Sequence, residues 1–369
     1  MVLTLMGCAP SSPRTTAPEA STSTASGQPG ATTSVTPAGS AGDAGAADGA
    51  ATDGSVDTAG TTTPPPITAR RAMTLMFLGD PPAEARSCRV QSSAHSSDGS
   101  SSARSSDGDA IRCMLAVRFA GDGQAGKSAL ALYDEAGTVA GIEEPHMMDG
   151  GWRGMLKLVP EPPVGRHRRH LVWLLGAAQD FNQWFADLHR DKKTKARYRH
   201  QPLELRFFRS VGRTTPSAYA SGWTVAYNVS GSLHSSAKAV RETMFHELFH
   251  LNDRDHGNWS EQHLTPIYDS IVTRCTNKWN KLNTACLRPY APHHVMVRGG
   301  TYYAFQPGNG VWEYAAELAT RYYVEHREIF AGRRLAKPAF KCGPEENARS
   351  WTLLVDEFFG GIDHIPACP

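Results

Sequence analysis

Apolar residues recur every three or four positions in four stretches of the chain: 164–189, 237–256, 311–325 and 350–359. In the first stretch the recurring residues are Leu171, Leu174, Leu175, Ala178, Phe181, Phe185 and Leu188. In the second they are Val240, Met244, Leu248 and Leu251. This spacing places the apolar side chains on one face of an α-helix. The sequence therefore predicts four helices that pack against a core.

Shorter apolar runs predict β-strands between clusters of glycine, serine and aspartate. Two such runs, 203–208 and 223–228, lie between the first two predicted helices. Three more, 73–77, 113–119 and 129–133, make us expect a β-rich region over 70–160, with a surface loop at 92–106. The combination of helices and strands predicts an α+β fold.

The N-terminal residues differ in composition from the rest of the chain. Residues 9–69 are almost entirely Ala, Ser, Thr, Gly, Pro and Asp and contain no aromatic residue. Such a segment buries too little apolar surface to offset the entropy of ordering, so it predicts a disordered tether. Leu5, Met6, Gly7 and Cys8 resemble the lipobox of bacterial lipoproteins, with residues 1–8 as a signal remnant. That resemblance implies a lipid on Cys8, which anchors the protein to a membrane.

The remaining cysteines point to an oxidising compartment. Six follow Cys8, and no C-x-x-C pattern suggests a thiol metal site. The pairing of sequence neighbours is simplest, although other pairings are open. It joins Cys88 to Cys113, Cys275 to Cys286 and Cys342 to Cys368. We therefore expect an extracytoplasmic protein of the bacterial cell envelope, in the periplasm, at the cell surface or secreted.

Charge and one local motif bear on the partners. The formal net charge is +2, which gives no reason to expect nucleic acid as a partner. Residues 121–128 satisfy the pattern of a phosphate-binding P-loop. A P-loop has to lead into a helix, whereas the run that follows alternates and predicts a β-hairpin. We therefore expect no nucleotide.

The pattern H-E-x-x-H occurs as His246, Glu247 and His250, inside the second predicted helix. Residues four apart lie one turn above each other on a helix, so the two imidazoles can bind one metal ion. Glu247 lies at the edge of the same face, where its carboxylate can accept a proton from water. A catalytic zinc ion (Zn²⁺) needs a third protein ligand, and the sequence offers two candidates.

The first candidate is His256, ten residues after His246, which is the spacing found in the metzincin peptidases. The metzincin glycine is missing, because Asp253 stands in its place. The second candidate is Glu313, which shares a helical face with Glu317. This helix and the H-E-x-x-H helix resemble the two ligand helices of the gluzincins, which are thermolysin-like and lethal-factor-like zinc metallopeptidases.

The gluzincin resemblance implies zinc bound by His246, His250 and Glu313, with Glu317 orienting a ligating histidine. It implies a zincin-like metallopeptidase domain over 161–369, with Glu247 as general base and a protein or peptide as substrate. Hydrolytic zinc sites often use a tyrosine or histidine to stabilise the oxyanion; the candidates here are Tyr302, Tyr303, His293 and His294. The alternatives are a metzincin-type peptidase with His256 as the third ligand, and a non-catalytic, zinc-containing surface lipoprotein that binds other molecules.

Overall fold

The computed structural model describes residues 66–369 except 94–101, 151–153, 191 and 298–299. These residues all belong to one compact unit. Cys8 and the predicted tether up to residue 65 lie outside the described residues, as does most of the predicted loop at 92–106.

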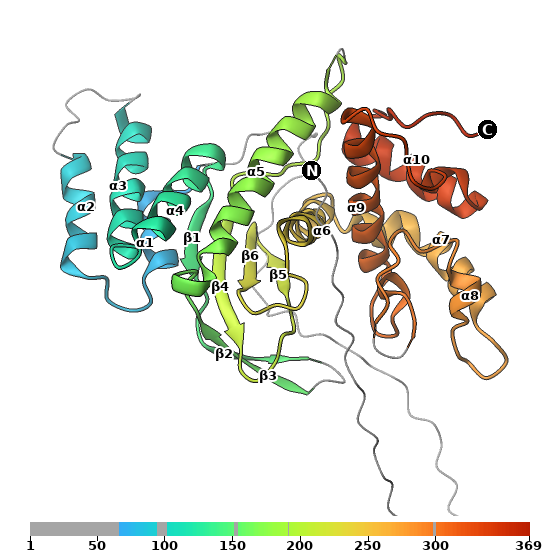
Figure 1. Ribbon diagram of the computed structural model, residues 1–369, viewed down its shortest axis with the longest axis horizontal. Helices are drawn as coiled ribbons and strands as arrows, with labels where there is room; N and C mark the ends of the chain where they lie inside the picture. Colours follow the sequence, from blue (N-terminus) through green and yellow to red (C-terminus); the bar gives the residue numbers. More distant parts are fainter. Residues whose placement is uncertain (1–65, 94–101, 151–153, 191, 298–299) are drawn as a thin grey trace, which may run out of the picture. The chain divides into compact units, whose positions relative to one another are not determined.

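Four helices, and no strands, lie within the described residues before residue 137 (Figure 1). They are α1 (Ala69–Met76), α2 (Ala83–Ser93), α3 (Ser102–Arg118) and α4 (Gly123–Ala136). The strands predicted at 73–77, 113–119 and 129–133 are therefore wrong. The buried residues of α4 explain the error, because they recur at helical spacing: Ala125, Ala129, Leu132 and Ala136.

The P-loop-like segment is part of this helical region. Asp122 caps α4 by accepting a hydrogen bond from the backbone N–H of Ala125. Residues 123–128 are consequently already helical and do not form a loop ahead of a helix. The predicted hairpin is wrong, and the segment that precedes it is helix α3 instead of a strand.

Six strands form one mixed sheet: β1 (Val139–Ile142), β2 (His146–Asp149), β3 (Met155–Pro160), β4 (Glu204–Ser210), β5 (Ala218–Ser221) and β6 (Thr224–Asn228). The order is β2-β3-β4-β6-β5, and β1 also pairs with β4. Strands β1 and β6 run parallel to β4, whereas β3 runs antiparallel to it. Strand β5 runs antiparallel to β6 and ends the sheet. The strands predicted at 203–208 and 223–228 correspond to β4 and β6.

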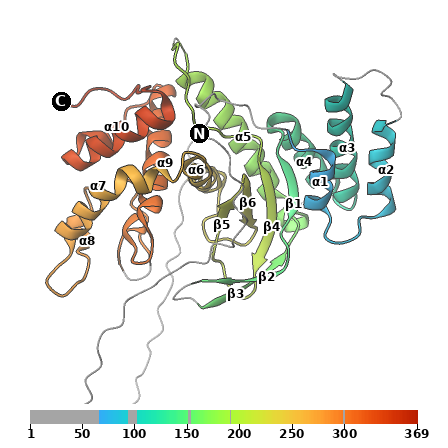
Figure 2. The ribbon, with the colours of Figure 1, turned by 180° about the vertical axis from the view of Figure 1, so that it is seen from behind.

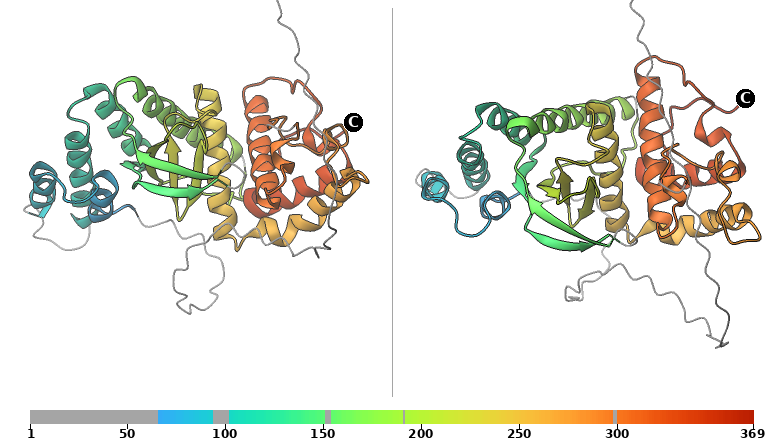
Figure 3. Two further views of the ribbon diagram at one scale, coloured as in Figure 1. Left: turned by 90° about the horizontal axis from the view of Figure 1, so that it is seen from below. Right: turned by 60° about the horizontal axis from the view of Figure 1, so that its bottom comes forward.

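Helices α5 (Arg169–Leu188) and α6 (Ala237–Asp255) cover one face of the sheet (Figures 2 and 3). Leu205 and Phe207 of β4 and Val225 and Tyr227 of β6 point into the core on this face. A smaller cluster on the other face contains Leu156, Leu158, Phe208 and Ala226. Alternate side chains of β4 and β6 thus point to opposite faces of the sheet, and both faces are buried. The larger core lies on the face that α6 covers.

A helical C-terminal part packs against α6. It consists of α7 (Trp259–Cys275), α8 (Thr284–Leu287), α9 (Val311–Phe330) and α10 (Glu345–Phe359), with short 3₁₀ turns between them. Helix α9 contacts α6, α7 and α10. The helices predicted at 311–325 and 350–359 are confirmed as parts of α9 and α10.

Three disulfides join the sequence neighbours, as predicted: Cys88–Cys113, Cys275–Cys286 and Cys342–Cys368. Disulfides persist in oxidising compartments, so they are compatible with an extracytoplasmic location. Among the described residues, none of the helices has the length and apolar character needed to span a bilayer.

Candidate metal centre

Helix α6 carries two of the three candidate ligands. Its first turn is capped by Ser236, whose hydroxyl accepts a hydrogen bond from the backbone N–H of Ala239. Val240, Met244 and Leu248 bury the opposite side of the helix in the main core. This packing fixes the rotation of α6, so that the side carrying the two histidines faces α9.

Helix α9 supplies two carboxylates one turn apart. Its buried alanines, Ala315, Ala316 and Ala319, allow a close approach to neighbouring helices because their side chains are small. Glu313 lies in the first turn, and Glu317 follows at helical spacing on the same face. Two histidines on α6 therefore face two carboxylates on α9.

Three ligand atoms meet between the helices. Nε2 of His246 lies 3.0 Å from Oε2 of Glu313 and 3.1 Å from Nε2 of His250. The Glu313 and His250 atoms are 3.7 Å apart. Among the described residues, this is the one group of three whose ligand atoms lie within 4.8 Å of one another. Tetrahedral zinc with bonds of about 2.1 Å requires ligand atoms ~3.4 Å apart. The observed separations bracket that value, so the spacing of the three donor atoms suits a tetrahedral zinc ion.

Glu317 contacts the other nitrogen of the first ligand. Its Oε1 lies 3.5 Å from Nδ1 of His246, while Nε2 of that ring points to Glu313. A carboxylate on the far nitrogen of a ligating histidine fixes its tautomer and orientation. Glu317 is 8% exposed, and its Oε2 has no hydrogen-bond partner among the described residues. Its position is the one that the gluzincin resemblance implies.

The electrostatics of the group favour a cation. Burial would lower the pKa of His246, but the Glu313 and Glu317 carboxylates outweigh burial and raise it well above its ordinary value. Burial would likewise raise the pKa of Glu313, yet His250 and His246 outweigh it and hold that pKa well below its usual range. With Glu247, three carboxylates surround two imidazoles. The group therefore attracts positive charge, which a proton or a metal ion could supply.

Glu247 is placed to act as a base beside the metal ligands. It follows His246 on α6 and is 7% exposed. Burial raises the pKa of its carboxyl, an effect that His246 and His250 oppose and Glu313 reinforces. A higher pKa makes the carboxylate a better proton acceptor near neutral pH. Glu247 is therefore a buried carboxyl group next to His246 in the sequence, with a raised pKa.

Of the four candidate oxyanion donors, Tyr303 is the one beside the metal ligands. It begins the 3₁₀ turn η3 (Tyr303–Phe305), and its ring centroid lies 6.0 Å from that of His246. Burial, and then the carboxylates of Glu313 and Glu247, raise the pKa of its hydroxyl. The tyrosine thus stays protonated and can donate a hydrogen bond.

The other three candidates have different surroundings. Tyr302 is buried, and its ring lies tilted against that of the exposed His294, with centroids 5.7 Å apart. His293 is half-buried, and burial lowers its pKa despite the opposing effect of Glu317. Its Nε2 has no hydrogen-bond partner among the described residues. Adjacent tyrosines therefore have different environments, which sequence alone does not distinguish.

His256 does not join the metal ligands. Helix α6 continues through Asp255, so the chain does not turn at Asn252 and Asp253 as a metzincin site needs. His256 is directed to α10, where its Nδ1 lies 2.6 Å from Oε1 of Glu357. Asp253 accepts hydrogen bonds from the N–H and hydroxyl of Ser260 and so fixes the start of α7.

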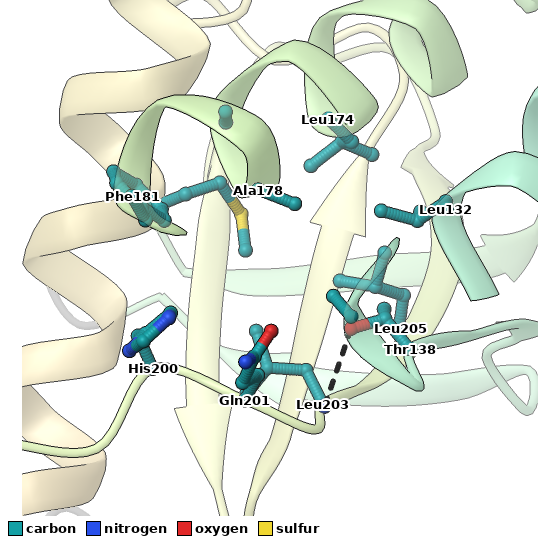
Figure 4. A pocket seen from close by; sticks show the side chains of 12 residues that line it. Leu132, Thr138, Leu174, Ala178, Phe181, His200, Gln201, Leu203 and Leu205 are labelled. Atoms are coloured by element: carbon teal, nitrogen blue, oxygen red, sulfur yellow. Dashed lines mark hydrogen bonds between the residues drawn. The ribbon is translucent and has the colours of Figure 1, made fainter. Parts of the chain in front are cut away.

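A small cavity lies apart from the metal ligands, between α4, α5 and β4 (Figure 4). Its volume is about 30 Å³, and apolar side chains such as Leu132, Leu174 and Leu205 line most of it. Gln201 Oε1 is buried there without a hydrogen-bond partner among the described residues. The cavity has room for roughly one water molecule, so it is a packing defect of the core and not a substrate site.

Sequence reasoning missed strand β5, because Ala218–Ser221 is short and only weakly apolar. The strand matters because it ends the sheet and contacts α6. The available signal was one tyrosine, Tyr219, between two alanines.

Comparisons with protein-family models, curated proteins and solved structures find no match.

Proposed function

We propose that this protein is a zinc-dependent endopeptidase of the gluzincin type. The observation that carries the proposal is the convergence of His246, His250 and Glu313 at separations that suit tetrahedral zinc. Glu247 and Glu317 add a base and an orienting carboxylate at this one point. A purely structural zinc site has no need of a base and usually completes its coordination with Cys or His.

The residues divide the chemistry of peptide hydrolysis among them. A bound zinc ion would polarise the scissile carbonyl and make water more acidic. Glu247 accepts the proton of the attacking water and passes it to the leaving amine. Tyr303 donates a hydrogen bond to the carbonyl oxygen as negative charge develops there. Glu317 holds His246 through Nδ1, so that Nε2 keeps its direction.

Strand β5 supports an extended peptide as the substrate. It is an edge strand of the sheet and contacts the helix that carries the metal ligands. An extended peptide can pair with such an edge through backbone hydrogen bonds. This mode of binding requires an unfolded or flexible segment. The substrate class we propose is therefore an unstructured segment of an extracytoplasmic protein or a free peptide.

The proposed location is the bacterial cell envelope, with a lipid on Cys8 as the anchor. Three disulfides in the folded unit are in keeping with an oxidising compartment. Labelling with a palmitate analogue tests the anchor, since a Cys8→Ser variant should lose both the label and membrane association.

The decisive experiment measures zinc and cleavage together. Purified protein should contain stoichiometric zinc and cleave an unstructured protein such as casein, with loss of activity in a chelator and recovery on zinc addition. Glu247→Gln should keep zinc but lose activity by about 10²–10⁴-fold. Glu242→Gln is the matched control, because this residue lies on the same helix and pairs with Lys238 at the surface.

Three outcomes would contradict the proposal. A preparation that binds no zinc and stays inert after zinc addition would exclude the metallopeptidase. A Glu247→Gln variant with full activity would exclude the assigned base. Zinc-containing wild-type protein that cleaves no unstructured substrate would favour the non-catalytic binding lipoprotein.

A further inference from the structure

A second pocket lies in the N-terminal helical region, between the end of α1, the end of α3 and β1. Its volume is about 430 Å³, which is in the range of small-molecule sites. Six apolar residues contribute to its lining, beside polar surface of at least equal extent: Met76, Phe77, Leu78, Pro82, Val117 and Ile142. Arg118 and Asp80 are the charged residues of the lining.

Arg118 has no partner for its charge. It is the last residue of α3 and is half-buried, and no described residue forms an ion pair or a side-chain hydrogen bond with its guanidinium. Burial lowers the pKa of this guanidinium, and no carboxylate opposes that effect. The carbonyl groups at the helix end favour a cation there, but no side chain among the described residues accepts a hydrogen bond from the guanidinium.

Asp80 does not neutralise Arg118. Its carboxylate is bonded to Arg86 at 2.7 Å, and the side chain is 86% exposed. The pocket therefore combines one surplus positive charge with apolar side chains. A partly desolvated charge is costly unless it is paired, so a ligand that brings an anion would stabilise this arrangement.

We propose that this pocket binds an aliphatic monocarboxylate, with the carboxylate paired to Arg118 and the hydrocarbon part against the half-buried Phe77, Leu78 and Ile142. A planar carboxylate matches the donor geometry of a guanidinium. An inorganic anion would leave these apolar side chains without a contact. Two sources share the chemistry: a free fatty acid, and the C-terminal residue of an apolar peptide. The proposal does not depend on the metal centre.

The test is calorimetric titration of the full-length protein with four probes. The acids are octanoate and N-acetyl-Leu-Phe, and their controls are octanamide and N-acetyl-Leu-Phe-amide, which lack the charge. We expect saturable binding of at least one acid and about 10-fold or greater weakening for its amide. The acid that binds more tightly identifies the source. Addition of a chelator should leave the affinity unchanged.

Variants locate the binding. Arg118→Gln should weaken binding of the acid by about 10-fold or more, and Arg118→Lys should weaken it less, because the charge remains. Arg112→Gln is the matched control, since Arg112 lies on the same helix and is paired with Asp134. If Arg118→Gln does not fold, the comparison of acid with amide on the wild-type protein decides. Three results would overturn the proposal. Neither acid binds saturably, or acid and amide bind with equal affinity, or a folded Arg118→Gln protein binds the acid as tightly as the wild type.

Discussion

Two buried histidines should make the protein sensitive to mild acid. His170 and His234 are 1% and 3% exposed. The His234 ring stacks on Tyr227, with centroids 3.8 Å apart, and its Nδ1 lies 2.8 Å from the carbonyl oxygen of Asn228. Burial lowers the pKa of His234 to about 4 and that of His170 to about 3. Both rings are therefore neutral in the folded protein at neutral pH.

The size of the effect follows from proton linkage. An unfolded histidine has a pKa of about 6.5, so below that pH the unfolded chain binds a proton that the folded chain does not. The contribution to stability is full above pH 6.5 and is lost as the pH falls toward the folded pKa. Between pH 8 and pH 5, His234 alone should lower the free energy of unfolding by about 2 kcal/mol. His170 adds a comparable loss, although adjacent sites are not strictly additive.

Urea unfolding of the wild type and of His234→Phe at pH 8 and pH 5 measures this loss. Chelator is present throughout, so that metal release does not contribute. The substitution removes the donor to Asn228 and costs about 1 kcal/mol at both pH values, and this cost cancels in the pH difference. The wild type should lose about 2 kcal/mol more than the variant between the two pH values. A control with the exposed His146→Gln should behave like the wild type. Equal losses in the wild type and His234→Phe would refute the reasoning.

Three further predictions concern the ligands and one disulfide. Glu313→Ala should weaken zinc binding strongly and His256→Ala hardly at all when affinity is measured by competition with a chromophoric chelator; the reverse ranking would exclude the gluzincin ligand set. Glu317→Gln should lower zinc affinity by about 10–100-fold in the same assay, because it removes the charge facing Nδ1 of a ligand; an unchanged affinity would contradict that role. Replacement of Cys275 and Cys286 by serine should lower the free energy of unfolding by about 3 kcal/mol, as expected for a short closed loop. Denaturant titration of the wild type and the variant without reductant measures this difference, and equal stabilities would contradict the prediction.

The parts of the fold that could be predicted are those with long, periodic patterns. Helix α6 carries the H-E-x-x-H pattern and an apolar face, and in the structure both lie on one continuous helix. The runs 73–77, 113–119 and 129–133 were misassigned because a short apolar run fits a strand or a buried helix equally well. Their neighbours at helical spacing, such as Ala125 and Leu132 in α4, contain the information that resolves this ambiguity.

The candidate site depended on one further fact that local sequence does not contain. His256 and Glu313 compete as ligands, and the choice depends on where α6 ends. The helix ends after Asp255 because Gly257 and Asn258 adopt left-handed backbone conformations there and begin a new turn. The preference for Tyr303 over Tyr302 likewise arises from a 3₁₀ turn whose orientation is set by packing with distant helices.

The three candidate metal ligands come from two helices that are far apart in the sequence. Between His250 on α6 and Glu313 on α9 lie 62 residues, which include helix α7. The donor atoms meet only where α9 packs against α6. The site is therefore completed by folding of the C-terminal helices, and a chain cut before α9 would keep only two of the three donors.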